Sequence, residues 1–244
     1  MAAQNENIFE ELAPYARLTV IPGVSVGQLN YVNQQDLTYT CVLPVTAGAV
    51  PANSILQFFQ GTLGDAATTA GYSAGTLSLS QTSSRFPRGQ APANQAFVSV
   101  STGFTINQLD TNDLTATPKA SLVPFADDLY ALAHNFSWDL TIGRGITRTI
   151  GTLASYCGPE AVYAIQNDAE APDAGDFYGS NTLGKPGMGF TKLKVPIVFP
   201  PLINVSITAQ NGSPFTLLDA IAQTTRYYQF KITLRGYLMT MPVG

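Results

Sequence analysis

Apolar and polar residues alternate strictly in two stretches near the end of the sequence. In residues 203–209 every second side chain is aliphatic, and those between are Asn, Ser or Thr. Residues 230–234 repeat the pattern, with Phe, Ile and Leu alternating with Lys and Thr. A period of two places the apolar side chains on one face of an extended strand, as in antiparallel sheets with one buried face. These stretches therefore predict two antiparallel strands.

Strand-like runs are spread over the remaining sequence, and short helices are few. A pair of strands is expected to break near Gly103, and another pair to join through a turn at Gly143. A dozen or more short strands with few helices are typical of an all-β sandwich or barrel. The runs cover residues 17–21, 24–32, 37–45, 54–60, 76–80, 97–101, 104–109, 136–142, 146–150, 161–165 and 193–199.

Three stretches have the pattern of short helices. Residues 6–13 carry Ile8, Phe9 and Leu12 on one side, and residues 124–133 begin with a proline. In the third stretch, Ser213 and Pro214 suit a helix start, with Phe215, Leu218 and Ile221 on one face. Residues 61–95 are rich in Gly, Ala, Ser and Thr and predict a long surface excursion.

Charge is scarce, and this limits the partners of the chain. Charged residues make up 11% of the sequence, against roughly a quarter in ordinary domains, although 45% of residues are hydrophobic. Such a surface is covered by amides and hydroxyls or by other copies of the protein. The twelve Lys and Arg residues are scattered, which argues against a nucleic-acid groove.

No stretch of the sequence has the features of a membrane span or a secretory signal. The apolar runs are all shorter than the roughly 20 residues of a transmembrane helix. The first residues lack a basic flank and an apolar core, so we expect synthesis in the cytoplasm. Cys41 and Cys157 are then expected to be buried free thiols rather than a disulfide.

Two loop motifs suggest ligands, but simpler interpretations fit them. Gly179 to Lys185 has the spacing of a phosphate-binding loop, yet Pro186 follows where that motif needs Ser or Thr. Oxygen donors also gather between residues 168 and 176, and calcium prefers such ligands. The spacing is not that of an EF-hand, so a solvated acidic loop is the simpler interpretation and Ca²⁺ the alternative. The candidate ligands are Asp168, Glu170, Asp173 and Asp176.

The sequence offers little for catalysis. His134 is its single histidine, so any nucleophile–histidine pair would have to use it, and no nucleophile elbow is present. We expect His134 to be structural, beside Trp138. Tyr227, Tyr228 and Tyr237 suggest an aromatic platform for a sugar, or else fillers at the edge of the core. Asp127 and Asp128 suit the start of a helix. The pattern favours a structural or binding protein and not an enzyme.

The C-terminal block resembles the jelly-roll capsid proteins of icosahedral viruses, especially those of bacterial viruses. The resemblance rests on residues 195–207, the short helix expected after them, and residues 230–238, about fifty residues in all. It implies a jelly-roll sandwich. The strand count and a composition shift near residue 124 suggest two jelly rolls in tandem, at 15–123 and 124–244, after an N-terminal arm at 1–14. One enlarged jelly roll with a long loop at 61–95 is the structural alternative.

The resemblance implies that the chain functions by assembly. Double jelly rolls of membrane-containing phages form trimers that tile a shell over a lipid vesicle. We therefore expect a virion protein that is made in the host cytoplasm. The resemblance implies that it assembles with itself as trimers, and with other virion proteins, over an internal membrane. Ile8, Phe9 and Leu12 would contact a neighbouring subunit or the membrane side. A carbohydrate-binding sandwich, such as a lectin or fibre-tip domain, is the alternative, and a hydrolase is the third hypothesis.

Overall fold

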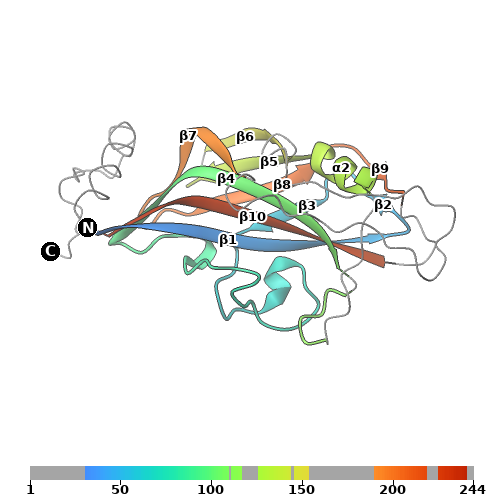
Figure 1. Cartoon of the computed structure of the whole chain (residues 1–244), viewed down its shortest axis with the longest axis horizontal. Helices are drawn as coiled ribbons and strands as arrows, with labels where there is room; N and C mark the ends of the chain where they lie inside the picture. The colour runs from blue at the N-terminus through green and yellow to red at the C-terminus, as the bar shows by residue number, and fades with distance from the viewer. Residues whose placement is uncertain are drawn as a thin grey trace.

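The computed structural model describes residues 31–109, 111–116, 126–143, 146–153, 190–218 and 225–240, and most of them lie in or between β-strands (Figure 1). This confirms the expected all-β class with few short helices. The strands are β1 (Tyr31–Thr46), β2 (Ala49–Val50), β3 (Ile55–Phe58), β4 (Gln95–Leu109), β5 (Phe136–Ile142), β6 (Ile146–Thr152), β7 (Thr191–Phe199), β8 (Val205–Asn211), β9 (Phe215–Thr216) and β10 (Thr225–Thr240). The helices are η2 (Ala67–Ala70), η3 (Pro87–Gly89) and α2 (Ala126–Asn135).

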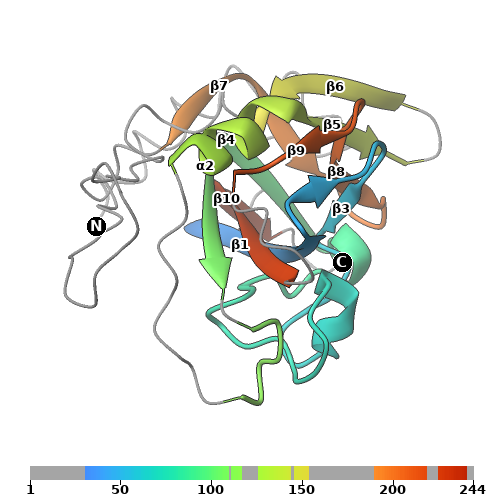
Figure 2. The same cartoon turned by 90° about the vertical axis from the view of Figure 1, so that its right-hand side faces the viewer.

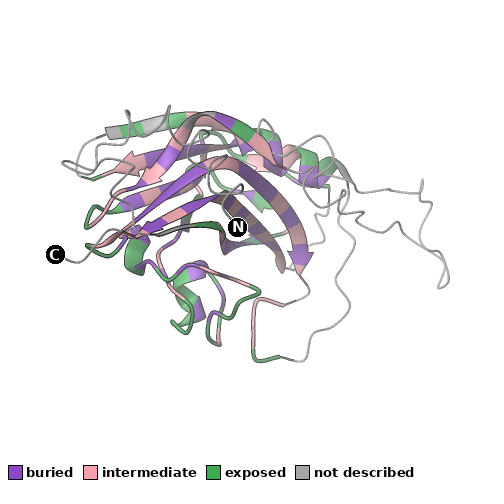
Figure 3. Ribbon diagram, turned by 60° about the vertical axis from the view of Figure 1, so that its left-hand side comes forward, coloured by how far each residue is buried: buried purple, intermediate pink, exposed green. Residues whose placement is uncertain are grey.

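The strands form two antiparallel sheets that pack face to face as a sandwich (Figure 2). The large sheet has the order β7-β4-β10-β1-β2-β9, and the small sheet has the order β3-β8-β5-β6. Burial alternates along β8 and most of β10, as Figure 3 shows by its striped strands. The alternation in the sequence therefore predicted these strands correctly, because one face of each sheet lies against the core.

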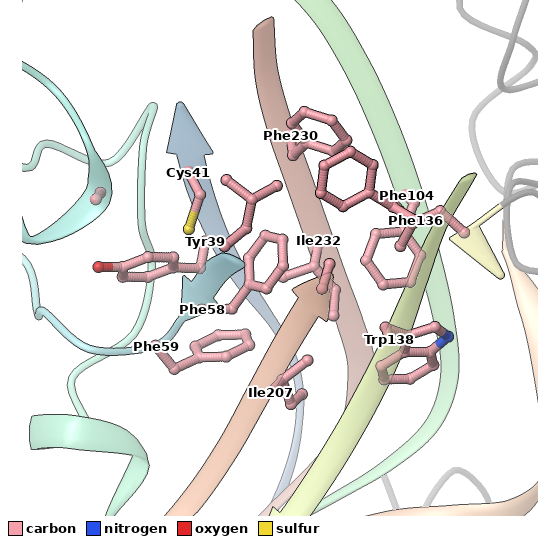
Figure 4. Packing of buried hydrophobic residues seen from close by; sticks show 14 of the residues in the cluster. Tyr39, Cys41, Phe58, Phe59, Phe104, Phe136, Trp138, Ile207, Phe230 and Ile232 are labelled. Carbon is pink, nitrogen blue, oxygen red and sulfur yellow. The ribbon is translucent and has the colours of Figure 1, made fainter. Parts of the chain in front are cut away.

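Large aromatic side chains fill the space between the sheets (Figure 4). Trp138 of the small sheet packs edge-on against Phe104 of the large sheet, with ring centroids 5.2 Å apart. Phe136 packs against Phe230 at 5.4 Å, and Phe58 against Phe104 at 6.3 Å. Aromatic pairs in such tilted or edge-on arrangements bury a large apolar area and add specific contacts. They join the two sheets into one core.

Strand pairing is nested along the chain. β1 pairs with β10, β3 with β8, β4 with β7, and β5 with β6. Each sheet therefore contains strands from both sides of residue 124, and a single main core cluster spans them. The described residues do not divide into separate jelly rolls at 15–123 and 124–244, because β10 supplies the central strand between β1 and β4. The tandem arrangement is wrong for this part of the chain.

A bulge explains why β4 is one strand and not two. Phe97 and Phe104 both face the core although seven positions separate them, which a regular period of two does not allow. The register shifts between Ser99 and Ser101 against β7, and between Arg235 and Gly236 against β10. An inserted residue changes which face the following side chains occupy. The expected break at Gly103 is therefore wrong, and the irregularity lies nearer Val100.

The excursion between β3 and β4 is packed against the sandwich rather than simply exposed. Its residues Phe59, Tyr72, Leu77 and Phe86 are buried. The strand expected at 76–80 is absent from the described structure; Leu79 is instead exposed in a turn closed by the side chain of Gln81. The burial of this excursion was not predicted from the sequence, because its few large side chains are separated by small ones.

The same excursion covers the free edge of β1. The Ser83 N–H donates to the Thr38 carbonyl at 3.1 Å, and the Thr38 N–H donates to Ser83 Oγ at 2.8 Å. Thr82 forms an isolated antiparallel bridge with Tyr39. An uncovered strand edge is a template for unwanted pairing with another chain. The excursion thus closes this edge, and Figure 1 shows it alongside β1.

The segment after β8 differs from its expected structure. Phe215 and Thr216 form the short strand β9, and Phe215 is opposite Val50 of β2. The Leu217 N–H also donates to the carbonyl of Gly48 at 2.8 Å. A helix starting at Ser213 is therefore wrong for residues 213–218, and Ile221 lies outside the described residues. Pairing with a distant strand here outweighs local helix signals. The helix expected at 124–133 appears as α2.

Candidate interaction surfaces

Hydroxyl and amide groups coat the outer face of the small sheet. Thr141 and Thr147 join β5 to β6 through their hydroxyls at 2.9 Å. Among the outward side chains that the structure describes on the strands of the small sheet, the charged residue is Asp139. A face with so little charge can meet another protein surface without desolvating ions. The outward polar residues are Ser137, Thr141, Thr147, Thr149, Ser206, Thr208 and Gln210.

Asp139 is unusual on this face because it is 7% exposed. Its Oδ2 accepts a hydrogen bond from the Gln210 amide at 3.1 Å. Its Oδ1 has no partner among the described residues. A buried carboxylate oxygen needs donors, so Gln210 is the residue that holds this acid in place.

One ion pair joins β1 and β10 on the outer face of the large sheet. Arg235 Nη2 donates to Asp36 Oδ2 at 3.0 Å, and Arg235 Nε donates to Asp36 Oδ1 at 3.1 Å. The Phe190 ring covers the guanidinium, with the Cζ atom 3.9 Å from the ring centroid. The fork of two hydrogen bonds and the stacked ring fix the side chain more firmly than a single surface contact. This pair was not among the interactions predicted from the sequence; the outward positions of both residues in alternating strands would have been its signal.

We expect Asp36→Asn to lower the free energy of unfolding by about 0.5–1 kcal/mol, because about a third of each side chain is exposed and solvent screens the pair. Arg235→Lys should lose a similar amount, since lysine keeps the charge but loses the fork and the stacking. Urea unfolding of Asp36→Asn, of Arg235→Gln and of the double variant that combines these two substitutions would give the coupling energy. Additive single effects would contradict the predicted coupling.

Apolar residues are exposed on a turn at one end of the sandwich. Leu202 has φ +59° and is 62% exposed, and Ile203 is 42% exposed. The Leu202 backbone is braced by the excursion: its carbonyl accepts from the Gln90 side chain at 2.7 Å, and its N–H donates to the Ala91 carbonyl at 2.9 Å. A left-handed leucine costs conformational energy, so these contacts are needed to hold the turn. The turn presents two aliphatic side chains outward.

Most of the residues predicted to bind a ligand or a neighbour lie outside the described residues. These include the arm residues Ile8, Phe9 and Leu12 and the Gly179–Lys185 loop. Among the residues that are described, no group of three or more His, Cys, Asp or Glu is placed to hold a metal ion. The candidate calcium ligands Asp168, Glu170, Asp173 and Asp176 also lie outside the described residues.

The structure places His134 and the tyrosines differently from one another. His134 is exposed at the end of α2, where its ring lies 3.9 Å from that of Tyr130, while Trp138 is fully buried. His134 therefore packs on Tyr130 at the surface, and its expected place beside Trp138 stays a prediction. Tyr228 is buried in the core and Tyr237 is buried on the outer face of the large sheet, so neither forms an exposed platform for a sugar, and Tyr227 is half-buried against the core.

Cys41 is a buried free thiol, as expected, whereas Cys157 lies outside the described residues. The Cys41 Sγ donates a hydrogen bond to the Gln57 carbonyl at 3.0 Å. Burial raises the pKa of the Cys41 thiol well above its ordinary value, so the group stays protonated and is a poor nucleophile. Cys41 is therefore part of the packing between β1 and β3.

Comparison with known proteins adds no relative. The chain matches no protein-family model and none of the curated proteins with which it was compared. Within the described part of the chain, none of the helices has the length and hydropathy of a membrane span.

Proposed function

We propose that the chain is a single jelly roll that assembles with copies of itself into the shell of an icosahedral virus particle. The observation that carries the proposal is the nested strand pairing, in which β1, β3, β4 and β5 pair in turn with β10, β8, β7 and β6. Winding four such pairs gives two facing sheets that contain β7-β4-β10-β1 and β3-β8-β5-β6, and the short strands β2 and β9 extend the first of them. Jelly rolls have this two-sheet, eight-strand arrangement and are common in viral capsids and lectins.

A jelly roll alone does not determine function, so the surface must support the choice of a capsid protein over a carbohydrate-binding protein. The hydroxyl face of the small sheet and the exposed aliphatic turn at Leu202 and Ile203 are suited to contacts between proteins. The low content of charged residues, 11% of the sequence, lets copies pack with little repulsion. The carbohydrate-binding alternative loses support because Tyr228 and Tyr237 are buried. We propose no enzymatic activity and no required cofactor.

The proposed partners are other copies of the chain and other virion proteins, with the virion as its location. Trimers and an internal lipid layer were implied by a tandem jelly roll, so a single jelly roll supports them less directly. The number of copies in the smallest stable assembly distinguishes these arrangements. Mass measurement by light scattering determines it.

We expect the purified chain to form oligomers or shells, and deletion of residues 1–13 to give a folded protein that does not assemble. The physical reason is that Ile8, Phe9 and Leu12 form an apolar face too short to be stable alone, which would be buried in a neighbouring subunit. Light scattering and electron microscopy would measure assembly, and circular dichroism would check folding.

Substitutions within the arm provide a matched control. Ile8→Ser with Phe9→Ser should prevent assembly, whereas Glu10→Gln with Glu11→Gln should leave it intact. Normal shells from the deleted protein would contradict the role of the arm. A full-length chain that stays monomeric at all concentrations would contradict the proposed function and favour the sugar-binding alternative.

A further inference from the structure

An apolar cluster lies on the outer face of the large sheet, away from the main core. Ala96, Val98 and Met239 are 0%, 1% and 5% exposed and form a cluster separate from the main core. In the register, Val98 and Ala96 lie opposite Tyr237 and Met239, whereas Phe97 between them faces the core. Val100 and Val198 pack against this cluster from the same sheet. We call these five residues the outer-face patch.

Side chains on the outer face of a sheet are solvated unless another layer covers them, so the burial of the outer-face patch requires a cover. The edge of this cover can be located. Tyr237 is 8% exposed, while Gln34, its register partner on β1, is exposed. The cover therefore lies over β10, β4 and β7 and stops before β1. It must present apolar groups, because the patch contains no charged residue.

We propose that residues 15–30 of the same chain cover the outer-face patch. The segment enters the sheet beside the patch, since Tyr31 lies opposite Thr240 and Val32 opposite Met239. It is rich in aliphatic residues and has a single charged residue, Arg17. Sixteen extended residues reach about 50 Å, and three neighbouring strands span only about 10 Å. The segment is thus long enough, suitable in chemistry and correctly placed.

The other long segment without a described structure is a poorer match. Residues 154–189 contain five acidic residues, namely Glu160, Asp168, Glu170, Asp173 and Asp176. Placing carboxylates against an apolar patch costs free energy unless each finds a partner. This segment joins β7 at Thr191, opposite Thr102, and the adjoining Phe190 lies on Arg235 of the outer face, so its acidic residues and not its position make it the poorer match. The competing outcome of the test is that residues 154–189 cover the outer-face patch.

The inference explains how the N-terminal arm would be positioned for assembly, a consequence that rests on the proposed function. If residues 15–30 are fixed against β10, β4 and β7, then residues 1–14 leave the molecule from the outer face of the large sheet. They would then be held near a neighbouring copy rather than tethered by a long loose linker. The arm and its base thus have separate roles, which two deletions can distinguish.

Oxidation of Met239 by peroxide, measured by mass spectrometry with fragmentation to separate it from Met241, tests the inference. In the full-length chain and in the protein lacking residues 1–13, we expect slow oxidation of Met239. Deletion of residues 1–29 should raise the rate by about tenfold or more, because methionine oxidation follows exposure. An unchanged rate would overturn the inference, and the cover would then be residues 154–189 or a second copy of the chain. Fast oxidation in the shorter deletion would also overturn it.

A full-length variant covers the case in which the longer deletion does not fold. Val24→Asp with Val26→Asp keeps the chain length and should also expose Met239, whereas the control Gln28→Asn should not. The protection must be independent of protein concentration, since loss on dilution would mean that a second copy supplies the cover. Light scattering of the same samples keeps the two proposals separate: assembly without Met239 protection defeats only this inference, and protection without assembly defeats only the proposed function.

Discussion

Replacing Gly236 with alanine is expected to destabilise the protein by about 3 kcal/mol, because there is no room for a Cβ atom at the β4–β10 bulge. That atom would collide with the Val98 carbonyl oxygen and lie 2.7 Å from the Ser99 Cα. Both neighbours are backbone, so neither can rotate away. The strands would have to separate at the centre of the large sheet. Gly236 is required here for close approach and not for a positive φ.

Gly212→Ala is the matched control, since a Cβ atom there meets nothing within 4 Å. It should change stability by no more than about 0.5 kcal/mol, as is usual for an open surface site. Urea unfolding can be followed by the fluorescence of Trp138, which is the single tryptophan and is fully buried. Equal stabilities of the two variants would contradict the geometry of the bulge.

Local sequence patterns identified many of the strands but not their partners. The alternation at 203–209 and 230–234 predicted β8 and β10, and the Gly143 turn predicted the β5–β6 hairpin correctly. The pairing of β10 with β1 joins residues about 200 positions apart, and no local period encodes such a contact. This is why the composition shift near residue 124 was mistaken for a domain boundary.

Faces and loops were predicted less well than strands, for a physical reason in each case. The bulge near Val100 changes the face of every later side chain in β4, and one inserted residue leaves almost no signal in a short alternating run. In the excursion, Tyr72 and Leu77 were visible as apolar residues, but small neighbours concealed their burial. At Phe215, helix-start residues predicted a helix, yet pairing with β2 determined the structure.

The interaction surfaces were predictable only in general character. A low charge content indicated a surface wetted by hydroxyls and amides, and the outer face of the small sheet has this composition. The Asp36–Arg235 pair required the register between two distant strands. Predicting the outer-face patch would have required knowledge of the bulge as well. Val98 and Phe97 are adjacent in sequence, and one belongs to the patch and the other to the core because they lie on opposite faces of β4. The predicted arm and calcium residues remain predictions.

Replacing Phe199 with alanine is expected to lower the free energy of unfolding by about 3–5 kcal/mol, the usual cost of truncating a fully buried phenylalanine. Its ring joins three segments. The centroid lies 5.9 Å from that of Phe59, 5.9 Å from that of Phe97 and 6.3 Å from that of Phe86. Phe59 and Phe86 both belong to the excursion, so the cavity would also loosen its attachment to the sandwich. Urea unfolding measures the first effect, and limited proteolysis between residues 60 and 90 measures the second.

Phe215→Ala removes a ring that is only half-buried and has one aromatic contact among the described residues, with Phe136 at 6.3 Å. It should cost about 1–2 kcal/mol and leave cleavage of the excursion unchanged, since the loss scales with the contacts and area removed. The excursion also shields the edge of β1 through Thr38 and Ser83, so its release should promote aggregation of Phe199→Ala at temperatures where the sandwich is still folded. If cleavage between residues 60 and 90 were no faster in Phe199→Ala than in Phe215→Ala, the excursion would be held by its hydrogen bonds to β1 and not by the aromatic cluster.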